Sequence, residues 1–351
     1  MDAAALEVRA REVLDRAAFE YFAGGADDEV TLRDNAEAWS RIRLLPRVMR
    51  DMSSVTTRAT LLGEAVTAPL LIAPMAFQRL GHPEGEAAMA RGAARAGLPM
   101  VVSTMSTVTL EDIAAIAPDA IRWFQFYVHR DRDLSRRLLD RAEASGCSAV
   151  VLTVDVPVVG RRRKDESNRF ALPAGMTVAN LEHSLESGHG SALSEYSNAA
   201  FEPSLTPDLL QWITTLTDLP LLVKGVLRAD DAGVAIDAGA RGIIVSNHGG
   251  RQLDGAIATA DALPAVAAAV GGRVPVLVDG GVRSGVDILR ALALGASAVL
   301  VGRPFLWGLA LGGDDGVAGV AAELIAELER AMFLCGARSV GEIDRSLVAG
   351  V

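Results

Sequence analysis

The stretch Gly242-Ile243-Ile244-Val245-Ser246-Asn247-His248-Gly249-Gly250-Arg251 joins a short apolar run to a polar, glycine-rich continuation. The apolar run predicts a strand buried on both faces, as in a parallel sheet. The polar residues that follow at once predict that this strand ends in a functional site. A histidine in a glycine-rich turn is most often only a turn residue, so its meaning depends on the rest of the chain.

Similar apolar runs recur along the whole sequence. The eight expected strands cover 70–73, 100–102, 123–126, 149–152, 221–223, 242–245, 276–278 and 298–301. Alanine-rich segments with helical periodicity follow most of them, namely 84–96, 132–145, 229–238, 284–294 and 317–332. Such units have the length of one strand with its helix. Eight of them predict an α/β fold of the closed (β/α)8 type, a TIM barrel, in preference to an open doubly wound sheet.

Two segments lie outside this regular pattern. The polar stretch 155–220, which contains His183 and His189, is expected to form a lid over the mouth of the barrel after its fourth strand. Residues 1–68 are expected to carry an amphipathic N-terminal helix and a hairpin around 55–66, which plug the barrel bottom or flank its mouth. Because no linker rich in proline and serine divides the chain, we expect a single domain over its whole length, 1–351.

The composition restricts the classes of partner. The chain has 34 Lys and Arg against 44 Asp and Glu, a formal net charge of −10. This balance argues against nucleic acid or an anionic membrane as a partner, so an anionic ligand must meet locally placed arginines.

The N-terminal segment, the cysteines and the histidines bear on the cellular location and on metal binding. The first 22 residues lack the apolar core of a signal peptide, and no apolar run reaches membrane-spanning length. With only Cys147 and Cys335, the chain is expected in a reducing, cytoplasmic compartment. The histidines and cysteines lack metal-ligand spacing, so no metal is expected.

In a (β/α)8 barrel the active site forms where the strands end, so these positions test the interpretation. Polar and titratable side chains are common there, more than a buried barrel needs, and they predict a cofactor pocket. In chain order the strand ends are Pro74-Met75-Ala76, Ser103-Thr104-Met105, Gln125-Phe126-Tyr127, Thr153-Val154-Asp155, Lys224-Gly225, Ser246-Asn247-His248, Asp279-Gly280-Gly281 and Gly302-Arg303.

The ends of the seventh and eighth strands predict a phosphate site. The glycines in Asp279-Gly280-Gly281 and Gly302 let backbone N–H groups approach phosphate oxygens, while Arg283 and Arg303 supply positive charge. Tight turns with surface arginines are the simpler alternative. Two such turns at these two strands favour phosphate binding.

Lys224 ends the apolar run Leu221-Leu222-Val223, where a charge is costly unless it faces an anion. A reduced flavin carries negative charge beside its pyrimidine ring, and a lysine there favours reduction. Schiff-base chemistry and an ordinary surface position are the alternatives. Candidates for hydrogen bonds to the polar edge of a flavin are Ser103, Gln125, Thr153 and the backbone of Ala76.

His248 and Arg251 suit an acidic substrate that must lose a proton. A neutral imidazole accepts a proton near neutral pH, and a guanidinium binds a planar carboxylate through two parallel hydrogen bonds.

From Tyr21 to about residue 345 the chain resembles the FMN-dependent α-hydroxy acid oxidase and dehydrogenase family, which includes glycolate, lactate and mandelate oxidases. The stretch 246–254 matches the family's most specific motif. Further matching segments, in order, are 152–157, 160–162, 222–226, 279–283 and 301–304.

The resemblance implies oxidation of an (S)-2-hydroxy acid to the 2-oxo acid, with His248 as the base, Asp155 stabilising its imidazolium and Tyr127 assisting. Whether a hydride or a proton leaves the α-carbon stays open. The residues implied for substrate binding are Tyr21, Tyr127, Arg162 and Arg251. The residues implied to hold FMN are Pro74, Met75, Ala76, Ser103, Gln125, Thr153, Lys224, Ser246, Asp279, Gly281, Arg283, Gly302 and Arg303.

Met105 stands where glycolate-oxidising members of the family carry a tryptophan. With Ala76, Phe77 and Phe126, this slimmer side chain is expected to line an apolar pocket for an aryl group. The segments 22–25, 76–80 and 170–173 are similar to bacterial mandelate and 4-hydroxymandelate oxidases. An aromatic 2-hydroxy acid is therefore preferred over lactate-like or glycolate-like acids, with ordinary packing as the alternative role of Met105.

Dioxygen, reduced to hydrogen peroxide, is the simplest electron acceptor, because no haem-binding extension precedes the barrel and the expected lid lacks an apolar stretch for docking to a membrane. A soluble dehydrogenase is the alternative. Two other classes are an FMN-dependent diphosphate isomerase, which does not call for the pair His248 and Arg251, and a non-catalytic flavin-binding barrel. The family commonly forms tetramers, which makes a homotetramer the expected assembly.

Overall fold

The strand β8 (Gly242–Val245) has the bounds that its sequence predicts, and all four of its residues are buried. It pairs in parallel with β7 (Leu221–Val226) and β9 (Val276–Val278). Parallel pairing continues around a closed barrel through β3 (Leu70–Ile72), β4 (Met100–Ser103), β5 (Arg122–Phe126), β6 (Ala149–Thr153) and β10 (Ala298–Val301). In this computed structural model, which describes residues 2–181 and 191–350, the predicted (β/α)8 barrel is confirmed.

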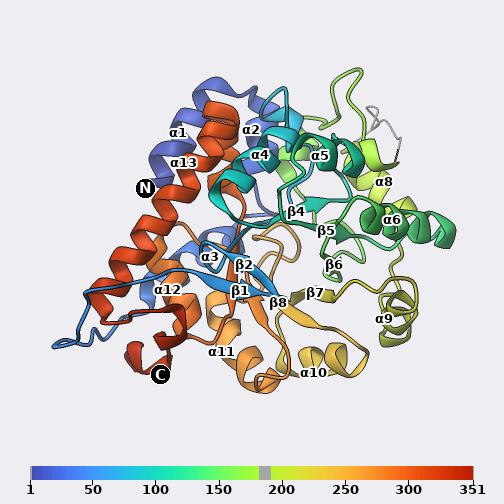
Figure 1. Cartoon of the computed structure of the whole chain (residues 1–351). Helices are drawn as coiled ribbons and strands as arrows, with labels where there is room; N and C mark the ends of the chain where they lie inside the picture. Colours follow the sequence, from blue (N-terminus) through green and yellow to red (C-terminus); the bar gives the residue numbers. More distant parts are fainter. Residues whose placement is uncertain (1, 182–190, 351) are drawn as a thin grey trace.

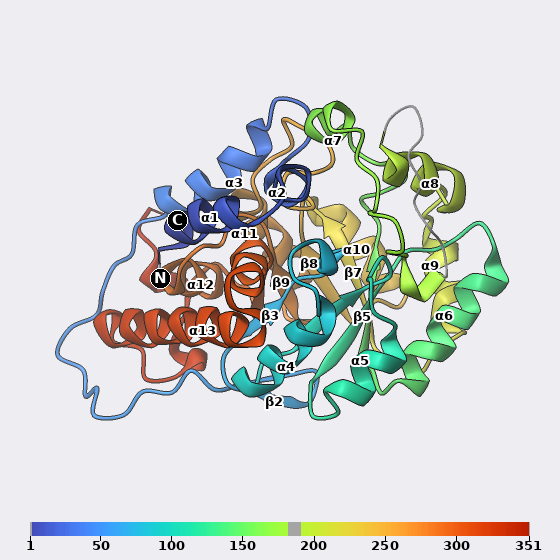
Figure 2. The same ribbon diagram turned by 90° about the horizontal axis from the view of Figure 1, so that it is seen from above.

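Helices surround the barrel, as Figure 1 and Figure 2 show. They are α4 (Glu86–Ala96), α5 (Leu110–Ile116), α6 (Arg132–Ala144), α9 (Pro207–Thr214), α10 (Ala229–Asp237), α11 (Thr259–Val270), α12 (Gly285–Ala293) and α13 (Arg303–Cys335). Gly312 and Gly313 lack helical backbone angles, so α13 consists of two helices joined at a kink. The predicted helix 317–332 is only the second of these.

The N-terminal segment forms α1 (Ala3–Val13), α2 (Arg16–Ala23) and α3 (Val30–Arg41), which lie on the same side of the molecule as α11, α12 and α13 (Figure 2). The expected N-terminal helical segment is confirmed, and the stretch expected as one amphipathic helix is divided into α1 and α2. Asp15 accepts hydrogen bonds from the backbone N–H groups of Ala17 and Ala18, and this cap begins a second helix after a break at Leu14.

The hairpin of β1 (Ala59–Leu61) and β2 (Glu64–Val66) closes the end of the barrel where the strands begin. Leu61 and Val66 pack with inward-facing barrel side chains such as Trp123. The hairpin leaves the opposite end of the barrel, where the strands finish, available for a functional site.

Between β6 and β7 the chain forms α7 (Arg163–Ser167), a 3-10 turn η2 (Ala179–Leu181) and α8 (Ala192–Ala200). His183 and His189 lie outside the described residues. The expected insertion 155–220 ends earlier, because Thr206 caps α9, Pro207 occupies its first turn, and α9 is the barrel helix that precedes β7.

Three further 3-10 turns are η1 (Gln78–Leu80), η3 (Val340–Glu342) and η4 (Arg345–Leu347). Within 2–181 and 191–350, no helix combines the length and the apolar character needed to cross a membrane.

Candidate active site

A cavity lies at the end of the barrel where the strands finish, and it gathers side chains from segments far apart in the sequence. The predicted site residues that line it are Tyr21, Pro74, Met75, Ala76, Ser103, Met105, Gln125, Tyr127, Thr153, Arg162, Lys224, His248, Arg251, Asp279, Gly281, Arg283, Gly302 and Arg303. Asp155 and Ser246 are predicted site residues that do not line the cavity and instead contact residues that do.

A row of hydrogen-bonded polar side chains crosses three neighbouring strands. Ser103 Oγ donates to Gln125 Oε1 at 3.1 Å, and Gln125 Nε2 donates to Thr153 Oγ1 at 3.0 Å. Ser103 pairs with Gln125 in the sheet register, so these two side chains project into the barrel at one level, and the hydrogen bond from Gln125 adds Thr153 to the row. They present both donors and acceptors, as the polar edge of a flavin requires.

Lys224 carries a buried positive charge in this cavity. Its Nζ lies 2.9 Å from Ser246 Oγ and 3.2 Å from Asp279 Oδ2. Burial opposes the charge, but the carboxylates of Asp279 and Asp155 more than offset it and raise the pKa of Lys224. Within the described part of the chain, the buried Oδ1 of Asp279 has no partner, so it can accept from a ligand hydroxyl such as one on a ribityl chain.

Ser246 was expected to hold FMN, but it does not line the cavity. Ser246 is fully buried and accepts hydrogen bonds from Lys224 Nζ and, at 3.0 Å, from the backbone N–H of His248. It therefore orients two residues of the site from behind the cavity wall.

The ends of β9 and β10 form a corner suited to phosphate. Gly281 has φ +81°, and a Cβ there would lie 2.1 Å from the Asn35 carbonyl oxygen, so only glycine fits this close contact with α3. Burial and the nearby guanidinium groups of Arg251 and Arg283 lower the pKa of Arg303 to about 9. A phosphate fits here, because its negative charge would offset the repulsion between these arginines.

His248 lies in the left-handed region, at φ 60°, directly after the strand. Its Nδ1 is 3.0 Å from Asp155 Oδ1. Burial opposes ionisation of Asp155, but His248 and Lys224 offset this and lower the pKa of Asp155. An ionised carboxylate only accepts hydrogen bonds, so Nδ1 carries the proton and Nε2 keeps a free lone pair.

The pKa of His248 is itself lowered. Burial is the largest cause, and Lys224 and Arg162 add to it, while Asp155 acts in the opposite direction. The imidazole is therefore neutral at pH 7 and able to accept a proton.

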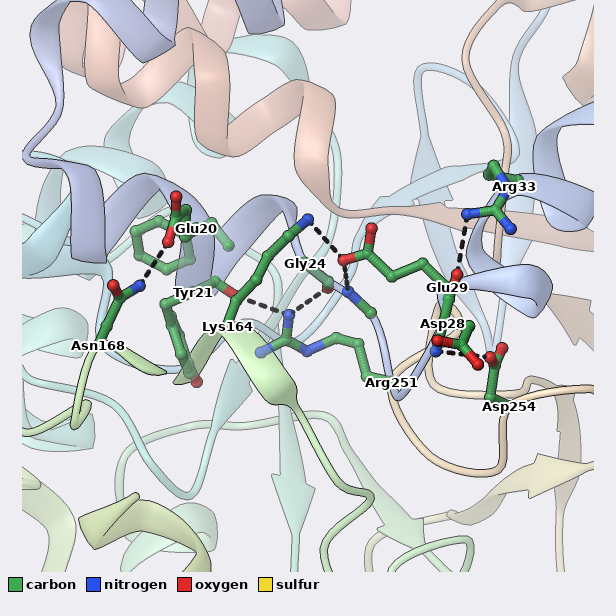
Figure 3. Close-up of polar contacts among 12 residues, drawn as sticks. Glu20, Tyr21, Gly24, Asp28, Glu29, Arg33, Lys164, Asn168, Arg251 and Asp254 are labelled. Carbon is green, nitrogen blue, oxygen red and sulfur yellow. Dashed lines mark hydrogen bonds and ion pairs between the residues drawn. The ribbon is translucent and has the colours of Figure 1, made fainter. Parts of the chain in front are cut away.

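Two arginines of the cavity hold the C-terminal end of α2, as Figure 3 shows for Arg251. Arg251 Nη1 donates to the carbonyl oxygens of Tyr21 at 2.6 Å and Gly24 at 2.8 Å. Arg303 donates to the carbonyls of Phe22 at 3.0 Å and Gly24 at 2.9 Å. With Nη1 engaged in this way, Arg251 can bind a carboxylate only through its remaining N–H groups.

Side-chain contacts fix α7 against the N-terminal segment (Figure 3). Asn168 donates to Glu20 at 2.6 Å, and Lys164 Nζ lies 2.7 Å from Glu29 Oε1. Since Arg162 directly precedes α7, these contacts also position that arginine at the cavity.

The apolar lining differs in part from the prediction. Met105 and Ala76 line the cavity, but Phe77 and Phe126 do not. Side chains alternate along a strand, so Gln125 points into the barrel while Phe126 points outward into the core beneath the helices. Phe77 is buried behind the cavity among other aromatic rings.

Sequence reasoning missed a set of lining residues that the insertion supplies. They are Val156, Val159, Leu193, Ser197 and Phe201. Phe201 stacks on Tyr127 with ring centroids 4.6 Å apart. The four-residue spacing of Leu193, Ser197 and Phe201 indicates one shared face of a helix, but it does not indicate that this face meets the cavity.

The comparisons with known proteins agree on the family. The family model described as FMN-dependent dehydrogenase matches residues 10–350. An L-lactate oxidase of Nostoc sp. is 49% identical over 97% of this chain and 96% of its own length. A 4-hydroxymandelate oxidase of Amycolatopsis orientalis is 47% identical, again over 97% and 96%.

Among solved structures, mandelate oxidase with (S)-4-hydroxymandelic acid superposes with a TM-score of 0.92 at 47% identity, covering 97% of this chain and 96% of that one. Lactate-oxidising and mandelate-oxidising relatives are about equally similar. Overall identity therefore does not decide the substrate.

Proposed function

Because this chain belongs to the FMN-dependent 2-hydroxy acid oxidases, we propose that its own substrate is an (S)-2-hydroxy acid with an aromatic side chain. The product is the 2-oxo acid, and dioxygen takes the electrons as hydrogen peroxide.

The observation that carries this proposal is the apolar part of the cavity. Met105, Val156, Leu193 and Phe201 line the same cavity as His248. An aryl group would bury far more apolar surface against these side chains than the methyl group of lactate, at roughly 25 cal/mol per Å². The hydrogen atom of glycolate would bury almost none.

We assign the chemistry to His248, whose Nε2 would take a proton from the substrate. The Asp155 carboxylate would stabilise the imidazolium that results, since the two groups are 3.0 Å apart. FMN, when bound, supplies the acceptor for the two electrons.

The substrate carboxylate would meet Arg251 and Arg162, with hydrogen bonds from the hydroxyls of Tyr21 and Tyr127. Burial raises the pKa of both tyrosines, so their hydroxyl groups stay protonated and act as donors. Arg162 Nε is buried and has no partner among the described residues, which leaves it free to donate to a ligand.

Anaerobic reduction of the flavin tests this proposal. With (S)-mandelate, (S)-4-hydroxymandelate, (S)-lactate and glycolate at equal concentration, we expect the two aromatic acids to bleach the flavin fastest, and peroxide to appear when oxygen is admitted. A protein that neither aromatic acid bleaches would overturn the proposed substrate.

A matched variant strengthens this test. In Met105→Trp a larger side chain would occupy the apolar region, so reduction by the aromatic acids should slow more than reduction by glycolate. Met105→Leu, with similar volume, should keep the wild-type order of the four acids. Faster reduction by lactate than by mandelate in the wild type would contradict the aromatic preference.

The pH dependence of kcat/KM follows from the lowered pKa of His248. The base is active when neutral, so activity should persist below the ordinary value of 6.5 and fall only as the pH drops through the lowered pKa. In Asp155→Asn the group that raises this pKa is lost, so the acid limb should move to still lower pH while kcat falls. An acid limb above 6.5 in the wild type would contradict the assignment.

We also propose a cytoplasmic homotetramer. Cys147 and Cys335 are both free and buried, which suits a reducing compartment. Light scattering coupled to size-exclusion chromatography measures the assembly directly.

A further inference from the structure

Ser197 is a buried hydroxyl group whose partner does not lie in the described part of the chain. The residue is 2% exposed, it lines the cavity, and its Oγ makes no hydrogen bond to residues 2–181 or 191–350. Leaving a buried hydroxyl unpaired costs free energy, so most such groups have a partner. A polar atom of a ligand in the cavity would supply one.

The surroundings of Ser197 on α8 are apolar. Leu193 and Phe201, one helical turn to either side, line the same cavity. The groups suited to a carboxylate, such as Arg162 and Arg251, come from other elements. Ser197 therefore lies between two apolar side chains of the region that we assign to the substrate side chain.

The position of Ser197 is fixed by contacts of α8 with two neighbouring loops. Asn198 Oδ1 accepts from the backbone N–H of Val159 at 3.1 Å, and the backbone N–H of Arg130 donates to the Ala200 carbonyl at 2.9 Å. Phe201 stacks on Tyr127 directly after the helix. The hydroxyl is thus held at a defined place in the cavity wall, which hydrogen-bond selectivity requires.

We propose that Ser197 Oγ hydrogen-bonds a hydroxyl group on the aromatic ring of the substrate and so selects hydroxylated aryl acids over unsubstituted ones. This inference rests on the function proposed above. A serine hydroxyl both donates and accepts, so it matches a phenol, which does the same. An unsubstituted ring would leave Ser197 Oγ buried and unpaired, and the site would discriminate against that acid.

The test compares kcat/KM for (S)-4-hydroxymandelate and (S)-mandelate in the holoenzyme and in Ser197→Ala. The wild type should prefer the hydroxylated acid. The variant should lose about 2- to 12-fold in the ratio of the two values, the usual worth of one neutral hydrogen bond.

Ser191→Ala is the matched control. Ser191 immediately precedes α8 and is also a buried hydroxyl without a partner in the described residues, but it does not line the cavity. It should leave the ratio unchanged. FMN content and melting temperature of both variants check that the fold is kept.

The outcomes separate the two proposals. If both acids are oxidised but Ser197→Ala leaves the ratio unchanged, or Ser191→Ala changes it equally, the role of Ser197 is overturned and the aromatic preference stands. If neither acid reduces the wild-type flavin, the aromatic preference fails, and the role of Ser197 fails with it.

Discussion

Replacing His248 with alanine is expected to reduce kcat by about 10²- to 10⁴-fold, the usual contribution of a placed general base. The imidazole can take a proton at the cavity, because Nδ1 is committed to Asp155 and no described residue makes a hydrogen bond to Nε2. The residues that we assign to the phosphate and to the polar edge of the flavin do not include His248. The purified variant should therefore keep FMN and stay yellow. Stopped-flow reduction under anaerobic conditions measures the effect directly.

His82→Ala is a suitable control for this variant. It makes the same chemical change on a histidine that does not line the cavity. It should turn over within a few-fold of the wild type. A His248→Ala protein that reduces as fast as the control would disprove the role of His248.

Arg251→Met is expected to lower kcat/KM by about 30- to 4,000-fold. Removing one partner of a buried, hydrogen-bonded charge pair costs roughly 2 to 5 kcal/mol, and 1.4 kcal/mol corresponds to tenfold. The substrate carboxylate loses its guanidinium, and the carbonyls of Tyr21 and Gly24 lose a donor. When the rate of flavin reduction is measured against acid concentration, the lower kcat/KM should appear mainly as weaker binding of the acid.

Arg251→Lys separates charge from geometry. It keeps a positive charge but has no planar fork with which to serve both carbonyls and a carboxylate, so it should recover only part of the loss. The melting temperature of each variant reports how firmly α2 is held. A variant that lowers only the melting temperature and leaves kcat/KM intact would assign Arg251 to structure alone.

The barrel was predictable because its strands are buried on both faces. Runs such as Gly242–Val245 are apolar without interruption, and each has the length of one barrel strand. The strand ends then identified most of the cavity, since a charge such as that of Lys224 is costly directly after such a run unless it faces an anion.

What the sequence did not reveal depends on contacts between distant segments. The cavity wall from α8, with Leu193 and Ser197, follows from how the insertion folds back over Tyr127. No local pattern indicates that backbone carbonyls near Gly24 would meet Arg251. The wrong prediction that Phe126 lines the pocket was avoidable. Side chains alternate along a strand, so an inward Gln125 requires Phe126 to point outward.

The contacts between α2 and the cavity arginines also constrain the order of assembly during synthesis. Arg251 and its acceptor Tyr21 are 230 residues apart, and β3 can meet β10 only after residue 301 exists. Contacts of such long range form late, because closing a long loop must precede them. We therefore expect the flavin pocket of a nascent chain to stay open until residue 301 has been synthesised, so that loading of FMN begins only after that point.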